Sequence, residues 1–156
     1  MPIQIGQEAP EFALYDTHKQ KVSLSSYRGK NVILLFFPFA FSSVCTRQMC
    51  EMGENYSYYQ KLNAEVIGIS VDSLFTNKQF RDEHKLSFPL LSDFNKEIAP
   101  LYDSLAETFA FEYRGVSKRA SFVIDRRGKI VYMEILKSPG DYPDMQKLKE
   151  VVATLI

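Results

Sequence analysis

Residues 32–37 form a run of six consecutive apolar side chains, and this run constrains the fold more than any other segment. A strand with one face in water alternates apolar and polar residues, so an unbroken short run predicts a strand buried on both faces of a sheet. Residues 66–71 form a second, nearly continuous run. Residues 43–62 have helical length, and residues 76–84 fit an amphipathic helix. This order of strand, helix, strand and helix predicts parallel strands covered by helices.

The second half of the chain predicts a hairpin. Residues 120–124 and 129–136 have strand patterns and are joined by a turn that ends at Gly128. The shorter expected elements are a small hairpin from residues 12–14 and 22–24, an apolar segment at 89–91, one or two helical turns at 96–102, and a helix at 142–155. No internal repeat or linker is found. We therefore expect one domain, residues 1–156, folded as an α/β sandwich with a mixed central sheet and helices on both faces.

The charge balance and the apolar runs exclude several classes of protein. Nineteen Lys and Arg residues match nineteen Asp and Glu residues, and no long basic run is present, so neither nucleic acid nor an anionic membrane is an expected partner. The first residues lack a basic start followed by an apolar stretch, and the longest apolar run is too short to span a bilayer. We expect a cytoplasmic protein.

The two cysteines, Cys45 and Cys50, indicate reactivity rather than structure. Two are too few for a disulfide scaffold, and their spacing is neither CxxC nor that of a zinc site. Cys45 follows the central strand, at the edge where α/β sheets place active sites, and falls in the first turn of a helix, where free N–H groups stabilise a thiolate. The alternative, a buried cysteine that acts as a small hydrophobe, fits this position less well.

The segment around Cys45 resembles a known signature. Pro38-x-x-x-Ser42-x-x-Cys45 is similar to the Pro-x-x-x-Thr/Ser-x-x-Cys motif of the peroxiredoxins, and three further segments match in order, at residues 6–12, 88–93 and 119–125. The spacing of Cys50 and the lack of a C-terminal Val-Cys-Pro resemble the bacterioferritin-comigratory and alkyl hydroperoxide reductase E branch. Ser42 replaces the usual Thr, which keeps the hydroxyl but loses a methyl. Gln48 stands where the family has Glu or Gln.

This resemblance implies a thioredoxin-like fold and a peroxidase that acts as an antioxidant oxidoreductase. Cys45 would attack hydrogen peroxide or an organic hydroperoxide and become a sulfenic acid. Arg119 would stabilise the thiolate and the peroxide oxygens, Ser42 would bond to both, and Pro38 would shield the sulfur from water. Gln48 would bridge to Arg119, but an ordinary surface glutamine is an equally good interpretation.

Other charged groups compete with these residues for the same roles. The residues alone do not select Arg119 from its neighbours, and only the family pattern does so; the competing cations are Arg114, Lys118, Arg126 and Arg127. Arg47 is expected to point to solvent. His18 and His84 lack the surroundings of a metal site and are expected at the surface, so neither a metal nor an organic cofactor is expected.

The role of Cys50 stays open at this stage. Five residues along a helix separate two Cα atoms by about 8.6 Å, whereas disulfides rarely tolerate more than ~7 Å. A Cys45–Cys50 bond therefore requires the first turns to unwind, which Gly53, expected to interrupt the helix, would favour. The resemblance implies that Cys50 resolves the sulfenic acid and that a thioredoxin-like or other dithiol reductant recycles the enzyme. A structural Cys50 in a one-cysteine enzyme is the main alternative.

Two further readings compete with a peroxidase. A non-catalytic redox sensor would use Cys45 as a switch that signals to a partner, and a thioredoxin-like disulfide reductase would need a CxxC motif and a proline just before Ala120, neither of which is present. The preferred peroxide, the reductant and the choice between monomer and homodimer stay undetermined. Aromatic residues near the site either line a shared face or fill loops; these are Phe39, Phe41, Phe109, Phe111 and Tyr113.

Overall fold

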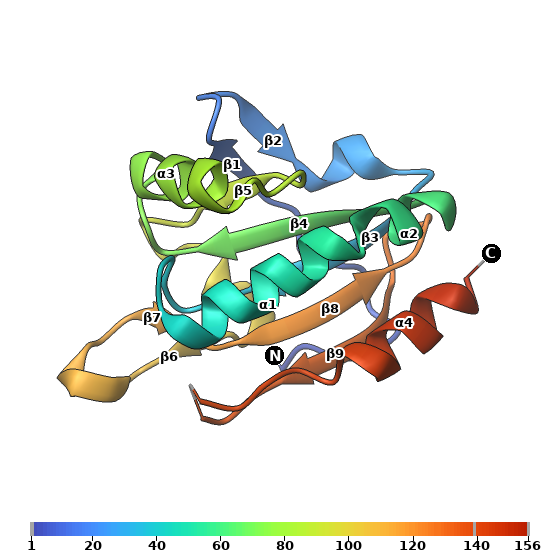
Figure 1. Cartoon of the computed structure of the whole chain (residues 1–156). Coiled ribbons are helices and arrows are strands. Elements are labelled where there is room, and N and C mark those ends of the chain that lie inside the picture. Colours follow the sequence, from blue (N-terminus) through green and yellow to red (C-terminus); the bar gives the residue numbers. More distant parts are fainter. Residues whose placement is uncertain (1, 139, 156) are drawn as a thin grey trace.

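Strand β3 (Asn31–Phe36) lies inside a seven-stranded sheet, and each of its six residues is buried. The computed structural model describes residues 2–138 and 140–155. β4 (Ala64–Ser70) runs parallel to β3 on one side, and β8 (Ala120–Ile124) runs antiparallel on the other (Figure 1). This confirms a central strand with both faces covered, as the unbroken apolar run predicts.

The remaining strands extend the sheet to both edges in the order β2-β1-β5-β4-β3-β8-β9. They are β1 (Ala13–Asp16), β2 (Lys21–Ser23), β5 (Leu90–Ser92) and β9 (Ile130–Ile135). Both expected hairpins form, since β1 pairs with β2 and β8 pairs with β9, each antiparallel. The sheet is mixed, because the β3–β4 and β4–β5 pairs are parallel and the other strand pairs of the described residues are antiparallel.

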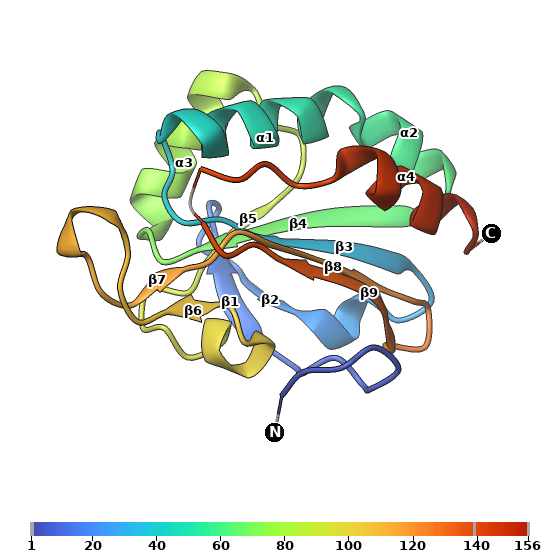
Figure 2. The ribbon, with the colours of Figure 1, turned by 90° about the horizontal axis from the view of Figure 1, so that it is seen from below.

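The α-helices of the described residues cover one face of the sheet (Figure 2). They are α1 (Ser43–Glu54), α2 (Tyr56–Lys61), α3 (Leu74–His84) and α4 (Met145–Ala153). Their buried apolar residues form one core cluster with Ile33, Leu35 and Val66 of the sheet. We call this the helix-side cluster. Burial of apolar side chains at about 25 cal/mol per Å² is the main free-energy gain that holds these helices to the sheet.

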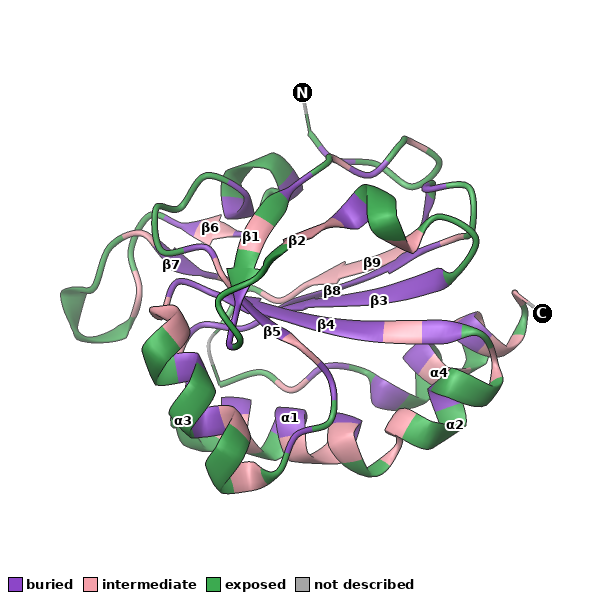
Figure 3. Cartoon of the chain, turned by 90° about the horizontal axis from the view of Figure 1, so that it is seen from above, coloured by how far each residue is buried: buried purple, intermediate pink, exposed green. Residues whose placement is uncertain are grey.

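The opposite face is covered by the N-terminal segment and two 3-10 helices, η1 (Leu24–Tyr27) and η2 (Ala99–Tyr102). Figure 3 shows the buried strands between the two layers. Val32, Leu34 and Phe36 of β3 point into this second core, which also contains Tyr102. We call it the N-terminal-side cluster. Helices therefore lie on both faces, as expected, although those on the second face are single 3-10 turns.

The structure corrects several details of the expected elements. Gly53 does not interrupt its helix, because α1 continues through it to Glu54 and the chain turns at Asn55. The C-terminal helix begins at Met145, three residues later than expected, where the side chain of Asp144 accepts the N–H of Lys147. Within the described ranges, no helix is long and apolar enough to cross a bilayer.

A short hairpin precedes β8 and was not expected from the sequence. It consists of β6 (Leu105–Ala106) and β7 (Val116–Ser117), with the 3-10 helix η3 (Ala110–Glu112) between them. The two strands have only two residues each, so the alternation of apolar and polar residues that marks a longer strand has no room to develop.

Candidate active site

Strand register brings Arg119 to the start of the helix that carries Cys45. Phe36, the last residue of β3, pairs with Ala120, the first residue of β8. Arg119 precedes Ala120, so it lies at the end of β3 from which the chain leaves toward α1. Cys45 is the third residue of α1, whose N-terminus begins at this same edge. The topology alone therefore places the two side chains at one end of the sheet.

The guanidinium of Arg119 contacts both Cys45 and Gln48. Its Nη1 atom donates to Sγ of Cys45 at 3.1 Å and to Oε1 of Gln48 at 3.0 Å. All three side chains are buried: Cys45 and Gln48 are 0 % exposed, and Arg119 is 2 % exposed. Gln48 is thus not a surface residue, and the expected bridge to Arg119 exists in the structure. A positive group at this distance stabilises negative charge on the sulfur.

A pocket of about 210 Å³ opens beside this contact. It is lined by Pro38, Phe39, Ser42, Ser43, Val44, Phe109, Arg119 and Gly140. Arg119 lines the pocket and touches the sulfur, so it links the open space to the buried Cys45 thiol. The pocket is large enough for a small molecule with two oxygen atoms and part of an attached group.

Pro38 and Ser42, the first two residues of the sequence motif, lie in the pocket wall. Pro38 is buried, and it carries no N–H that would compete for the sulfur. The hydroxyl of Ser42 donates to the backbone carbonyl of Phe39 at 3.1 Å. Its expected bond to the thiolate and the peroxide stays a prediction, and it requires the hydroxyl to rotate away from Phe39.

The loop between β3 and α1 is held from outside by an aspartate that the sequence analysis missed. The Ala40 N–H donates to Oδ2 of Asp72 at 2.7 Å. Phe41, the next residue, has a left-handed backbone with φ of 72°. Asp72 directly follows the apolar run 66–71, just beyond the carboxyl end of β4. Sheets of this class place functional side chains at this position, and that signal was available in the sequence.

Cys50 lies within the intact helix α1 and is partly buried, and both cysteines are free thiols. The unbroken helix agrees with the expectation that the folded form keeps the two sulfurs apart. Burial, followed by the nearby carboxylate of Glu54, raises the pKa of the Cys50 thiol above its ordinary value. The folded helix therefore favours a neutral, less nucleophilic Cys50.

The outer side of α1 is tied to the segment before α4. The guanidinium of Arg47 stacks on the ring of Tyr142, with 3.7 Å from its carbon to the ring centroid. The Tyr142 hydroxyl donates to Oε1 of Glu51 at 2.6 Å. Arg47 is exposed, as expected, but it is not free in solvent. Because Arg47 lies between the two cysteines and Glu51 directly follows Cys50, these contacts oppose unwinding of this part of α1.

The histidines and the aromatic residues near the site complete its surroundings. His18 is exposed, whereas His84 is half-buried against Phe80, with ring centroids 5.1 Å apart. In the described part of the chain, no group of three His, Cys, Asp or Glu side chains could hold a metal ion. Phe39 packs edge-on against Phe109 and Tyr113. Whether these rings line a shared face between two copies or fill loops within one chain stays undetermined.

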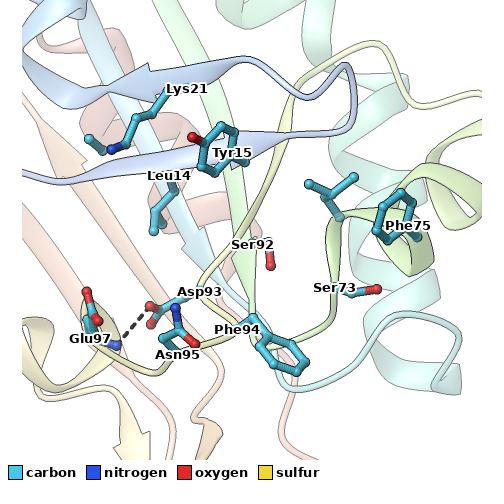
Figure 4. Close-up of a pocket in the computed structure, with 12 residues that line it drawn as sticks. Leu14, Tyr15, Lys21, Ser73, Phe75, Ser92, Asp93, Phe94, Asn95 and Glu97 are labelled. Carbon is cyan, nitrogen blue, oxygen red and sulfur yellow. Dashed lines mark hydrogen bonds between the residues drawn. The ribbon is translucent and has the colours of Figure 1, made fainter.

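A larger pocket of about 410 Å³ lies away from the cysteines, between the β1–β2 hairpin, the start of α3 and the segment after β5. Figure 4 shows Tyr15, Phe75 and Phe94 around it. Asp93, in its floor, accepts the N–H groups of Glu97, Ile98 and Ala99 and so fixes the turn that leads to η2. The Asp93 carboxylate therefore stabilises this turn through backbone hydrogen bonds.

The fold agrees with comparisons to known proteins. Residues 5–133 match the AhpC/TSA family. The chain is 35% identical over 133 residues to "Peroxiredoxin Bcp" of Bacillus subtilis, covering 84% of each protein. It is 34% identical over 154 residues to "Alkyl hydroperoxide reductase E" of Mycobacterium tuberculosis, covering 98% of each. The solved structure of "Peroxidoxin BcpB" from the same organism superposes with a TM-score of 0.83 at 25% identity, covering 98% of this chain and 96% of that one. The chain therefore belongs to the AhpC/TSA family, in which these relatives carry peroxiredoxin and alkyl hydroperoxide reductase names.

Proposed function

We propose that this protein is a thiol-dependent peroxidase in which Cys45 reduces hydrogen peroxide and organic hydroperoxides. The observation that carries the proposal is the 3.1 Å contact between Nη1 of Arg119 and Sγ of Cys45 beside a small pocket. A cation fixed against a sulfur in the first turn of a helix is the arrangement expected of a nucleophilic thiolate. The names of the relatives support the same class of enzyme.

In the first half-reaction, the Cys45 thiolate attacks the terminal oxygen of a hydroperoxide ROOH. A sulfur–oxygen bond forms as the oxygen–oxygen bond breaks, and the leaving RO⁻ takes up the proton that the thiol gave up, so the products are a sulfenic acid and ROH. Charge moves from sulfur to oxygen, and the guanidinium of Arg119 lies where it can stabilise both atoms. Gln48 fixes the orientation of that guanidinium through its own acceptor oxygen.

In the second half-reaction, the thiol of Cys50 attacks the sulfenic acid of Cys45, forming a disulfide and releasing water. This step needs α1 to unwind between the two residues, because an intact helix keeps their Cα atoms about 8.6 Å apart. Unwinding also exposes the disulfide, and a thioredoxin-like or other dithiol reductant is the natural recycler of an exposed disulfide.

A one-cysteine peroxidase is the second candidate, and a specific observation favours it. The raised pKa of the Cys50 thiol makes it a poor nucleophile in the folded helix. In that case an external thiol would reduce the Cys45 sulfenic acid directly. A non-catalytic redox sensor has less support, since it does not need the pocket beside Arg119.

Two variants and one mass measurement test the function. Cys45→Ser should abolish peroxide consumption, while Cys50→Ser should leave the rate of the first oxidation nearly unchanged. Non-reducing intact-mass analysis after stoichiometric peroxide should show a loss of two hydrogens in the wild type and a gain of one oxygen in Cys50→Ser. An equal loss of the first oxidation step in both variants contradicts the assignment of Cys45 as the nucleophile. A gain of one oxygen in the wild type supports the one-cysteine alternative.

A further inference from the structure

Asp72 connects the loop that precedes Cys45 to the carboxyl ends of two neighbouring strands. Its Oδ2 atom accepts the N–H of Ala40 at 2.7 Å and the hydroxyl of Ser70, the last residue of β4, at 2.8 Å. The hydroxyl of Ser92, the last residue of β5, donates to the backbone carbonyl of Asp72 at 2.6 Å. Two strands therefore fix Asp72, and Asp72 in turn fixes Ala40.

The loop needs such an external contact because its own backbone is strained. Phe41 adopts a left-handed φ of 72°, which is unfavourable for a residue with a side chain, and the residue is 44% exposed. Residues held in such conformations persist only when their surroundings over-determine them. The hydrogen bond from Ala40 to Asp72 restrains the residue directly before Phe41. Ala40 lies three positions ahead of α1, the helix that carries Cys45.

Because the Asp72 carboxylate is partly desolvated, its hydrogen bond from Ala40 stabilises the loop more than the same bond to an exposed carboxylate would. Burial raises the pKa of the Asp72 carboxyl, and the hydrogen bonds from Ala40 and Ser70 oppose that effect by stabilising the charged form. Hydrogen bonds to an ionised acceptor are about twice as strong as neutral ones. The aspartate thus has a cost of burial that only its contacts with the loop and Ser70 offset.

We propose that Asp72 is a positioning residue that acts through the Ala40 N–H to hold residues 38–45 in the conformation that reduces peroxide, an inference that rests on the peroxidase function proposed above. Asp72 does not touch the sulfur or the pocket. Its loss releases the loop, so that Pro38, Ser42 and Cys45 spend less time in their reactive arrangement around Arg119. Formation of the Cys45–Cys50 bond does not need that arrangement, because it begins from an unwound helix.

This difference between the two half-reactions separates positioning from general destabilisation. In stopped-flow measurements, Asp72→Ala should slow the oxidation of Cys45 by hydrogen peroxide about tenfold, and disulfide formation from the sulfenic acid should be unchanged or faster. Asp72→Asn retains an acceptor oxygen for Ala40, and Ser70 can accept from the new amide, so its oxidation rate should return to within about threefold of the wild type. Rescue of this kind is not expected if the residue merely fills space.

Asp16→Ala provides the matched control. Asp16 is also buried and accepts two backbone N–H groups, from His18 at 2.8 Å and Gln20 at 3.0 Å, but it lies in the β1–β2 turn. The Asp16→Ala variant should have a lower melting temperature but an unchanged rate of Cys45 oxidation. If Asp72→Ala and Asp16→Ala slow oxidation equally, or if Asp72→Asn is as slow as Asp72→Ala, the positioning role is overturned.

Two further outcomes are distinguishable. If Asp72→Ala does not fold, Asp72→Glu carries the test, because its carboxylate is displaced by one methylene group: a folded variant with slowed oxidation supports positioning, and an unchanged rate overturns it. If the wild type itself does not consume peroxide, the proposed function fails, and that result is independent of every Asp72 variant.

Discussion

Arg119 and Cys45 are 74 positions apart in the chain, and yet Nη1 of one lies 3.1 Å from Sγ of the other. The distance is set by the pairing of Phe36 with Ala120, which fixes where Arg119 leaves the sheet. Since side chains alternate between the two faces of a strand, a shift of one residue in this register would turn the β8 side chains to the opposite face. The nucleophile and its cation are thus assembled by the central strand pair.

Replacing Arg119 tests that contact directly. Arg119→Ala should slow the oxidation of Cys45 by about 10² to 10³-fold, because a positioned donor for the developing charge is lost. Arg119→Lys should be affected less, about tenfold, since it keeps the charge but not the planar donor geometry. Stopped-flow fluorescence with hydrogen peroxide measures both rates. Arg127→Ala, in the exposed β8–β9 turn, is the control, and an equal effect there would show that only net charge matters.

Gln48 should separate activity from stability. Its Oε1 accepts from Arg119, but in the described structure its buried Nε2 has no hydrogen-bond partner, which is unfavourable for folding. Gln48→Met keeps the volume and removes that polar atom, so the melting temperature should stay equal or rise. Oxidation of Cys45 should nevertheless slow about tenfold, as Arg119 loses an acceptor that orients it. A variant that is both less stable and fully active would contradict this account.

Disulfide formation should accelerate with rising pH. Burial first, and then the Glu54 carboxylate, raise the pKa of Cys50 in the folded helix, whereas unwinding removes the burial. The folded helix therefore binds more protons than the unwound one above the ordinary cysteine pKa of about 8.5, and its stability relative to the unwound form falls as pH rises through that window.

A sequential-mixing experiment follows this step, with peroxide added first and disulfide formation recorded from pH 7 to 9.5. Glu54→Gln removes the second cause of the shift, so the rise in rate should be smaller and should end at a lower pH. Glu8→Gln, which is remote from α1 and paired with Arg28, is the matched control. A rate of disulfide formation that does not change with pH would argue that Cys50 is not the attacking thiol.

Tyr142 should control how readily α1 opens. Tyr142→Phe removes the hydrogen bond to Glu51 and should destabilise the helix by roughly 1 kcal/mol, and Tyr142→Ala also removes the stacking on Arg47. Both variants should form the Cys45–Cys50 disulfide faster, with the larger effect for alanine. The rate of the first oxidation should change little. Slower disulfide formation in these variants would show that α1 does not need to unwind near Tyr142.

The sequence predicts the strands of the sheet better than it predicts which helices cover each face. The continuous apolar runs at β3 and β4 and the turn at Gly128 identify the central strands and the hairpin, because burial on both faces and turn geometry leave local signals. Which helices lie on which face depends on long-range packing and leaves no such signal. The β6–β7 hairpin is too short to show a period at all.

The candidate site also contains some residues that the local sequence identifies and others that depend on long-range contacts. The motif from Pro38 to Cys45 is local in the chain, so its position at a strand end can be read directly. Arg119 could not be selected from its neighbouring cations without the family pattern, since its choice depends on β3–β8 register. The position of Asp72 after an apolar run marks it as a candidate, but its partner, the N–H of Ala40, is distant in the chain and leaves no local signal. Tyr142 acts through distant helix atoms, and no local pattern reports that contact.

The two core clusters on either side of the sheet have a consequence for repeated turnover. Cys45, Met49 and Met52 of α1 all belong to the helix-side cluster, and the N-terminal-side cluster contains no residue of α1. Opening α1 in the proposed cycle therefore disturbs one apolar layer and leaves the other closed. Local opening of this kind costs far less free energy than global unfolding. The sheet separates the two clusters, so the N-terminal-side cluster keeps the strands in place while α1 is open. The active-site helix can then refold onto the same sheet surface after each reduction.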